Sequence, residues 1–113
     1  MNATYAILDA KWLESCPKSA AISAGMDALV HTLESFMTTN AKPLTRAFNR
    51  EAFVLLWKNL PALEDLPSDL NARQNLLLGA YLAAAGLFNS GSGIAGGLSY
   101  PLGVHYHVPH GIG

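Results

Sequence analysis

Charged residues are scarce in this chain, and the few that occur do not cluster. Only 13% of the 113 residues are Asp, Glu, Lys or Arg, whereas 50% are hydrophobic; an ordinary soluble domain carries about 25% charged residues. The formal net charge is −1 and no basic run occurs, which excludes the electrostatic footprint of a nucleic-acid or anionic-membrane partner. The shortage of charge predicts that part of the surface is covered by another domain or subunit, so we expect a homo-oligomer.

Cysteine and long apolar runs are also rare. Cys16 is the single cysteine, which excludes a disulfide framework and a Cys-x-x-Cys motif. Because it lies beside Pro17 with no histidine nearby in sequence, we expect a half-buried, unreactive thiol rather than a nucleophile. The most apolar segment runs only from Leu76 to Phe88, which is shorter than the roughly 20 residues of a membrane span. Since the N-terminus also lacks a signal-peptide pattern, we expect a cytoplasmic protein without membrane association.

Apolar residues that recur at helical spacing dominate the rest of the chain. They predict helices over residues of about 23–38, 43–60, 69–88 and 94–100, with Pro43 as the first residue of the second helix and Pro101 ending the last. Residues 4–8 are expected to form a short strand-like segment, and the last dozen residues are expected to be irregular. The predicted fold class is all-α, a helical bundle in a single domain over residues 1–113. Its central helix is 69–88, which is apolar almost all round.

The stretch "AGMDALVHTLES", residues 24–35, carries the first candidate site residues. Asp27 and His31 are four residues apart, which places them one above the other on a helix, with about 5–6 Å between their Cβ atoms. A carboxylate and an imidazole so placed can converge on one metal ion. The alternative is a core histidine that is hydrogen-bonded to Asp27. Glu34, one turn further, could orient the His31 imidazole without binding the ion itself, or it could face solvent.

The C-terminal stretch "YPLGVHYHVPHG" adds three histidines, His105, His107 and His110. Pro109 would restrict the backbone just before His110, and Gly111 would allow it to turn just after. In an extended segment, His105 and His107 would point to the same side. Three histidines this close are compatible with metal binding or with a solvated loop. The nearby "NSGSGIAGG" lacks the Lys-Ser/Thr pair of a phosphate-binding loop and follows a helix rather than a strand, which excludes that interpretation.

Four segments in combination resemble the iron-containing alcohol dehydrogenase family: "AILDAKWLESCP", "AGMDALVHTLES", "NARQNLLLGAYLAAAGLFNSGSG" and "LSYPLGVHYHVPHG". The resemblance covers essentially the whole chain. It implies NAD(P)-linked hydride transfer between an alcohol and nicotinamide, in a protein with a dinucleotide-binding domain and a helical metal-binding domain. This chain matches the start of the helical domain, and no glycine-rich pyrophosphate turn occurs in it. We therefore expect the isolated chain to be inactive and not to bind NAD tightly.

The resemblance also assigns site residues. Asp27, His31 and His110 match three of the family's four metal ligands, and Gly96 stands where the fourth, a histidine, is usual. The implied cofactors are Fe(II) or Zn(II), held less tightly because of Gly96, and NAD(P) in the full-length protein. Tyr100 matches a position where some members have another active-site histidine, and its hydroxyl could donate a hydrogen bond to a substrate oxygen. His105 or His107 is a less favoured substitute for the missing ligand.

Two functional hypotheses follow from these residues. In the first, the chain is a fragment of a metal-dependent dehydrogenase whose full-length form acts on a small primary or secondary alcohol or its aldehyde. In the second, it is a degenerate, non-catalytic helical module that self-associates.

Overall fold

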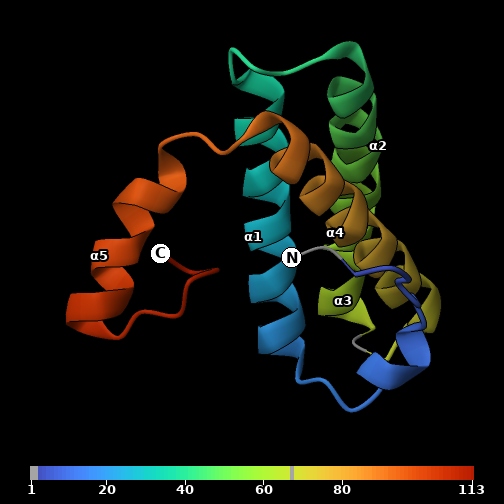
Figure 1. Ribbon diagram of the computed structural model, residues 1–113. Helices are drawn as coiled ribbons and strands as arrows, with labels where there is room; N and C mark the ends of the chain where they lie inside the picture. Colours follow the sequence, from blue (N-terminus) through green and yellow to red (C-terminus); the bar gives the residue numbers. More distant parts are fainter. Residues whose placement is uncertain (1–2, 67) are drawn as a thin grey trace.

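Helices make up the regular secondary structure of residues 3–66 and 68–113, the part of the chain that this computed structural model describes. The elements in chain order (Figure 1) are the 3-10 helix η1 (Ala10–Leu13) and the α-helices α1 (Lys18–Met37), α2 (Pro43–Asn59), α3 (Ala62–Asp65), α4 (Leu70–Ser90) and α5 (Ala95–Tyr106). These residues contain no strand, so the predicted all-α fold class is confirmed. Residues 1–2 and 67 of the predicted single domain lie outside the described part.

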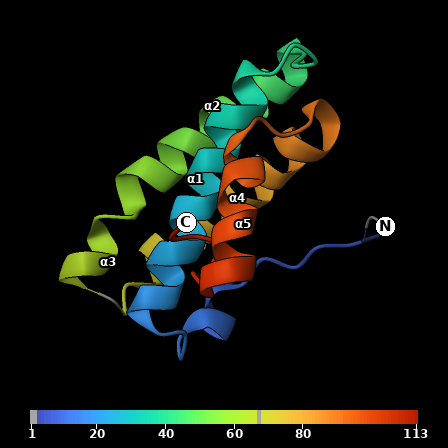
Figure 2. The same ribbon diagram turned by 90° about the vertical axis from the view of Figure 1, so that its left-hand side faces the viewer.

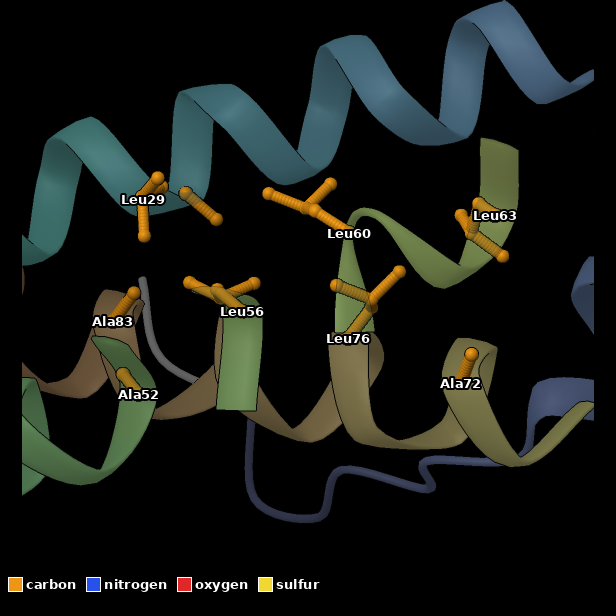
Figure 3. Packing of buried hydrophobic residues seen from close by; sticks show 9 residues of the cluster. Leu29, Ala52, Leu56, Leu60, Leu63, Ala72, Leu76 and Ala83 are labelled. Carbon is orange, nitrogen blue, oxygen red and sulfur yellow. The ribbon is translucent and has the colours of Figure 1, made fainter. Parts of the chain in front are cut away.

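The three long helices α1, α2 and α4 pack against one another and form what we call the core bundle. Each of the three contacts the other two, so the predicted central position of α4 does not set it apart from α1 and α2; α4 also contacts η1. Small residues let α4 approach α1 and α2 closely, and Gly79, Ala83 and Gly86 of α4 are all buried. Leucine and alanine side chains from the three helices and from the segment after α2 fill the space between them (Figure 3): Ala28, Leu29, Ala52, Leu56, Leu60, Leu63, Ala72, Leu76 and Ala83.

Local hydrogen bonds define the ends of these helices. Pro43 begins α2, where the missing proline N–H costs nothing. The Asp69 carboxylate accepts the backbone N–H groups of Asn71 and Ala72, at 2.9 and 3.1 Å, and so caps α4. At its other end α4 stops at Gly91, whose φ of 83° is readily adopted only by glycine.

Two sequence-based expectations about the N-terminal third are corrected by the structure. Residues 4–8 are not strand-like, because no neighbouring strand pairs with them in the described chain. The Gln74 side chain of α4 holds this segment instead, donating to the Leu8 carbonyl and accepting the Ala10 N–H, at 3.0 and 2.9 Å. Helix α1 begins directly after Pro17, five residues earlier than expected. Cys16 is half-buried, as predicted.

The expectation that Pro101 ends a short helix is also wrong. Helix α5 continues past Pro101 to Tyr106, so part of the C-terminal stretch predicted to be irregular is helical. Proline removes one backbone hydrogen bond, but the turns on either side of it still form. Figures 1 and 2 show α5 beside α1, on the side away from α2.

Helix α5 differs from the core bundle in its packing. None of its 12 residues is buried. Within the described residues, no single helix has both the length and the apolar character to cross a membrane; only α4 and α5 together do, as a pair bent by 110°.

Candidate metal centre

Asp27 and His31 lie one turn apart on the side of α1 that faces α5, as their spacing predicts. His31 Nδ1 lies 3.6 Å from Asp27 Oδ2, and 28% and 30% of the two side chains are exposed. The separation is too long for a good hydrogen bond. The structure therefore does not support the alternative of a core histidine bonded to Asp27, because both groups line an open cavity instead.

His110 reaches the same place from the other end of the chain. His107, with φ 55°, ends α5 in a left-handed conformation, and the backbone N–H groups of Ile112 and Gly113 bond the Pro109 carbonyl, at 2.9 and 3.2 Å. This turn brings His110 Nε2 to 3.2 Å from Asp27 Oδ1. Gly111 makes the approach possible, since a Cβ atom there would overlap the backbone of Ser23 on α1.

Asp27 thus presents one carboxylate oxygen to each histidine. One donor atom from each of Asp27, His31 and His110 lies within 4.8 Å of the other two. One carboxylate and two imidazoles are a usual donor set for Zn(II) and Fe(II). The cavity beside them has a volume of about 260 Å³, and Met26, Val30 and Ala95 give it apolar walls. By donor chemistry and by spacing, these three residues fit a divalent cation.

Gly96 forms part of the wall of this cavity. A Cβ atom at this position would meet only the Tyr100 ring, whose Cε2 is 3.7 Å away, so there is room for a side chain. Position 96 therefore faces the site but provides no donor. His105 and His107 do not line the cavity. His105 is on α5 and His107 ends that helix, so the extended arrangement that would align them is not found.

Two contacts at the site were not foreseen from the sequence. Glu34 neither orients His31 nor faces solvent: its side chain is buried, and Oε1 accepts the backbone N–H of Ala95, the first residue of α5, at 2.6 Å. Ile94 provides no side-chain cap for α5, so the Glu34 carboxylate, which is distant in sequence, can cap the start of this helix. The Tyr100 ring stacks on the His110 imidazole. No local pattern signals either contact, because each joins residues from separate elements.

The described part of the chain is all-helical and brings one carboxylate and two histidines to one cavity, a donor set that metalloenzymes use. Residues 21–113 match the model of the Fe-containing alcohol dehydrogenase family, C-terminal part. The 4-hydroxybutyrate dehydrogenase of Clostridium kluyveri is 32% identical over 113 residues, which cover 98% of this chain and 30% of that protein. The chain belongs to the Fe-containing alcohol dehydrogenase family.

Solved structures of related enzymes agree with this assignment. An iron-containing alcohol dehydrogenase from Thermotoga maritima matches with a TM-score of 0.90 and 29% identity, over 98% of this chain and 30% of that chain. A sulfoacetaldehyde reductase from Bifidobacterium kashiwanohense, solved in complex with NAD+, matches with a TM-score of 0.87 and 25% identity, over 91% and 27%. The chain thus spans less than a third of the length of these relatives.

Proposed function

We propose that this chain is the metal-binding part of an NAD(P)-linked dehydrogenase that interconverts a small primary or secondary alcohol and its carbonyl product. The observation that carries the proposal is the meeting of Asp27, His31 and His110 around one cavity, although His110 is far from the other two in sequence. The relatives support it, because they are dehydrogenases or reductases of this chemical class. We further propose that the isolated 113 residues do not turn over substrate.

Asp27, His31 and His110 are the residues that would hold Fe(II) or Zn(II). When bound, such an ion supplies Lewis-acid chemistry at the oxygen of the alcohol. Zn(II) functions with three protein ligands and an open position, whereas octahedral Fe(II) would be more affected by the missing donor at Gly96. We therefore propose a site of reduced affinity that favours Zn(II).

The other residues of the cavity would handle the substrate. Met26 and Val30 provide apolar walls, which suit the carbon chain of a small alcohol and exclude water from it. Tyr100 does not line this cavity itself but lies beside it, against His110. Its hydroxyl is proposed to donate a hydrogen bond to the substrate oxygen. Because the described helices contain no strand–helix–strand unit for a dinucleotide, we assign NAD(P) binding to a separate domain of the full-length protein.

The decisive test is Zn(II) binding, measured by elemental analysis and by titration against a chromophoric chelator. Asp27→Ala should abolish binding, whereas Asp65→Ala, which removes an exposed carboxylate from α3, should not. His31→Ala should weaken binding, and the matched variant His105→Ala on α5 should have no effect. Zn(II) binding that survives Asp27→Ala would overturn the proposed site.

Position 96 offers a gain-of-function test of the same site. Gly96→His places an imidazole in the cavity wall and should raise Zn(II) affinity at least about tenfold, which corresponds to about 1.4 kcal/mol. Gly97→His is the control, because position 97 is exposed and does not line the cavity. Equal Zn(II) affinity in the two variants would mean that a side chain at position 96 does not coordinate the ion.

The second hypothesis, a non-catalytic module that self-associates, is favoured by one observation. Large apolar side chains are exposed on α1, α2 and α5, among them Phe36, Met37, Trp57 and Leu98. Covering them would be favourable. Light scattering at increasing concentration checks this proposal: a growing mass supports association, and a monomer at high concentration contradicts it. NADH formation by the isolated chain would exclude the non-catalytic hypothesis.

A further inference from the structure

The aromatic ring of Tyr100 lies against one face of the His110 imidazole. The two ring centroids are 5.1 Å apart and the ring planes differ by 28°, which is a stacked arrangement. Tyr100 belongs to α5, whereas His110 lies in the turn beyond the end of that helix. Aromatic pairs at such distances attract each other beyond the effect of the area they bury. The stack therefore links a helical residue to the imidazole of a residue in the C-terminal turn.

His110 needs such support more than the other two candidate ligands. Asp27 and His31 extend from α1, where the preceding helical turn restricts their rotamers. His110 has no helix beneath it, and its side chain is the most exposed of the three, at 43%. Asp27 approaches the edge of its imidazole at Nε2, and Tyr100 covers its face. These two contacts fix the direction in which the ring points.

The Tyr100 ring lies beside Gly96, at a distance that would also accommodate a Cβ atom. Tyr100 is four residues after Gly96, and helical side chains lean back over the preceding turn. The ring accordingly lies next to the bare backbone of Gly96, with Cε2 3.7 Å from the place of a Cβ atom. Gly96, which provides no fourth side-chain donor, is thus adjacent to Tyr100, which contacts the third donor, His110.

We propose that Tyr100 is a positioning residue whose ring, rather than its hydroxyl, holds the His110 imidazole with Nε2 directed toward Asp27. A divalent cation then meets the third donor already in place, which avoids the entropic cost of ordering an exposed imidazole. The inference rests on the proposed metal site and deepens it. It is separate from the proposed contact between the Tyr100 hydroxyl and substrate.

The test compares Zn(II) affinity in variants of the 113-residue chain. Tyr100→Phe keeps the ring and should bind Zn(II) within about twofold of the unaltered chain. Tyr100→Leu keeps an apolar side chain without a ring and should lose about three- to tenfold, the range expected for an aromatic pair. Tyr106→Leu is the matched control, since Tyr106 is on the same helix and comparably exposed, at 75% against 65% for Tyr100, and it should have no effect.

A measurement without metal tests the stack itself. In NMR spectra of the metal-free chain, the ring current of residue 100 should shift the His110 ring protons upfield, in the unaltered chain and in Tyr100→Phe. The shift should vanish in Tyr100→Leu, while far-UV circular dichroism shows the same helix content in all variants. Unshifted His110 protons in the unaltered chain would overturn the inference.

The outcomes separate this inference from the proposed function. If Tyr100→Phe loses as much affinity as Tyr100→Leu, the hydroxyl rather than the ring is responsible, and the inference is wrong. If Zn(II) binding is lost in Asp27→Ala but unchanged in Tyr100→Leu, the inference fails and the proposed metal site stands. If the unaltered chain does not bind Zn(II), both fail.

Discussion

The core bundle of α1, α2 and α4 and the C-terminal arm, residues 91–113, are held in place by different forces. The bundle buries leucine and alanine side chains between its helices. The arm includes α5, which buries no residue, and it is attached by polar and backbone contacts. Among these contacts are the bond from the Ala95 N–H to Glu34, the approach of His110 to Asp27, and the packing of Gly111 on Ser23.

The candidate metal site therefore lies where a region with a buried apolar core meets a region that buries little. Two of its donors are carried by the bundle, and the third is carried by the arm. The free energy gained by burying apolar side chains is proportional to the buried area, and it stabilises the bundle without an ion. The arm buries little area, so this term contributes less to holding it. Because His110 belongs to the arm, the three donors are together only when the arm lies against α1.

The largest expected effect comes from a core substitution. Leu56→Ala in α2 removes a fully buried side chain and should lower the free energy of unfolding by about 3 kcal/mol, through lost burial and a residual cavity. Leu98→Ala on α5 removes an exposed side chain and should change it by less than about 0.5 kcal/mol. Urea denaturation followed by circular dichroism measures both. Equal losses would show that the arm is part of the cooperative core.

An intermediate effect is expected from metal. In the proposed site Zn(II) would bind only when the arm is docked, because its donors come from both regions. An ion at a hundred times its dissociation constant should then stabilise docking by about 2.7 kcal/mol. Hydrogen exchange should then slow by up to about a hundredfold in residues 95–113 and remain unchanged at buried amides of α4. In Asp27→Ala the ion should have no effect on exchange. Slowing of similar size in both regions would contradict the comparison.

The smallest effect concerns the carboxylate that caps α5. Glu34→Gln keeps the shape of the side chain but replaces a charged acceptor with a neutral one, which should weaken the bond to Ala95 by about 1 kcal/mol. Exchange in residues 95–106 of the metal-free chain should rise about fivefold. Glu51→Gln, at an exposed position of α2, is the control. An unchanged rate in Glu34→Gln would mean that other contacts hold the arm.

Local information in the sequence was sufficient for the parts of this protein that depend on near neighbours. The 3–4 spacing of apolar residues predicted the all-α fold class, and Pro43 predicted the start of α2. Spacing alone also placed Asp27 and His31 on one face of a helix, because the geometry of four helical residues is fixed. The family resemblance was readable for the same reason, since its motifs are short and contiguous.

The tertiary structure alone decided how distant segments meet. Glu34 caps α5, Tyr100 stacks on His110, and α5 continues through Pro101. The strand-like composition of residues 4–8 produced no strand, because a strand requires a partner that the described chain does not provide. The convergence of His110 on Asp27 depends on the turn after α5 and on the close approach of Gly111 to α1. Such contacts are set by packing between elements, which no local pattern of side chains records.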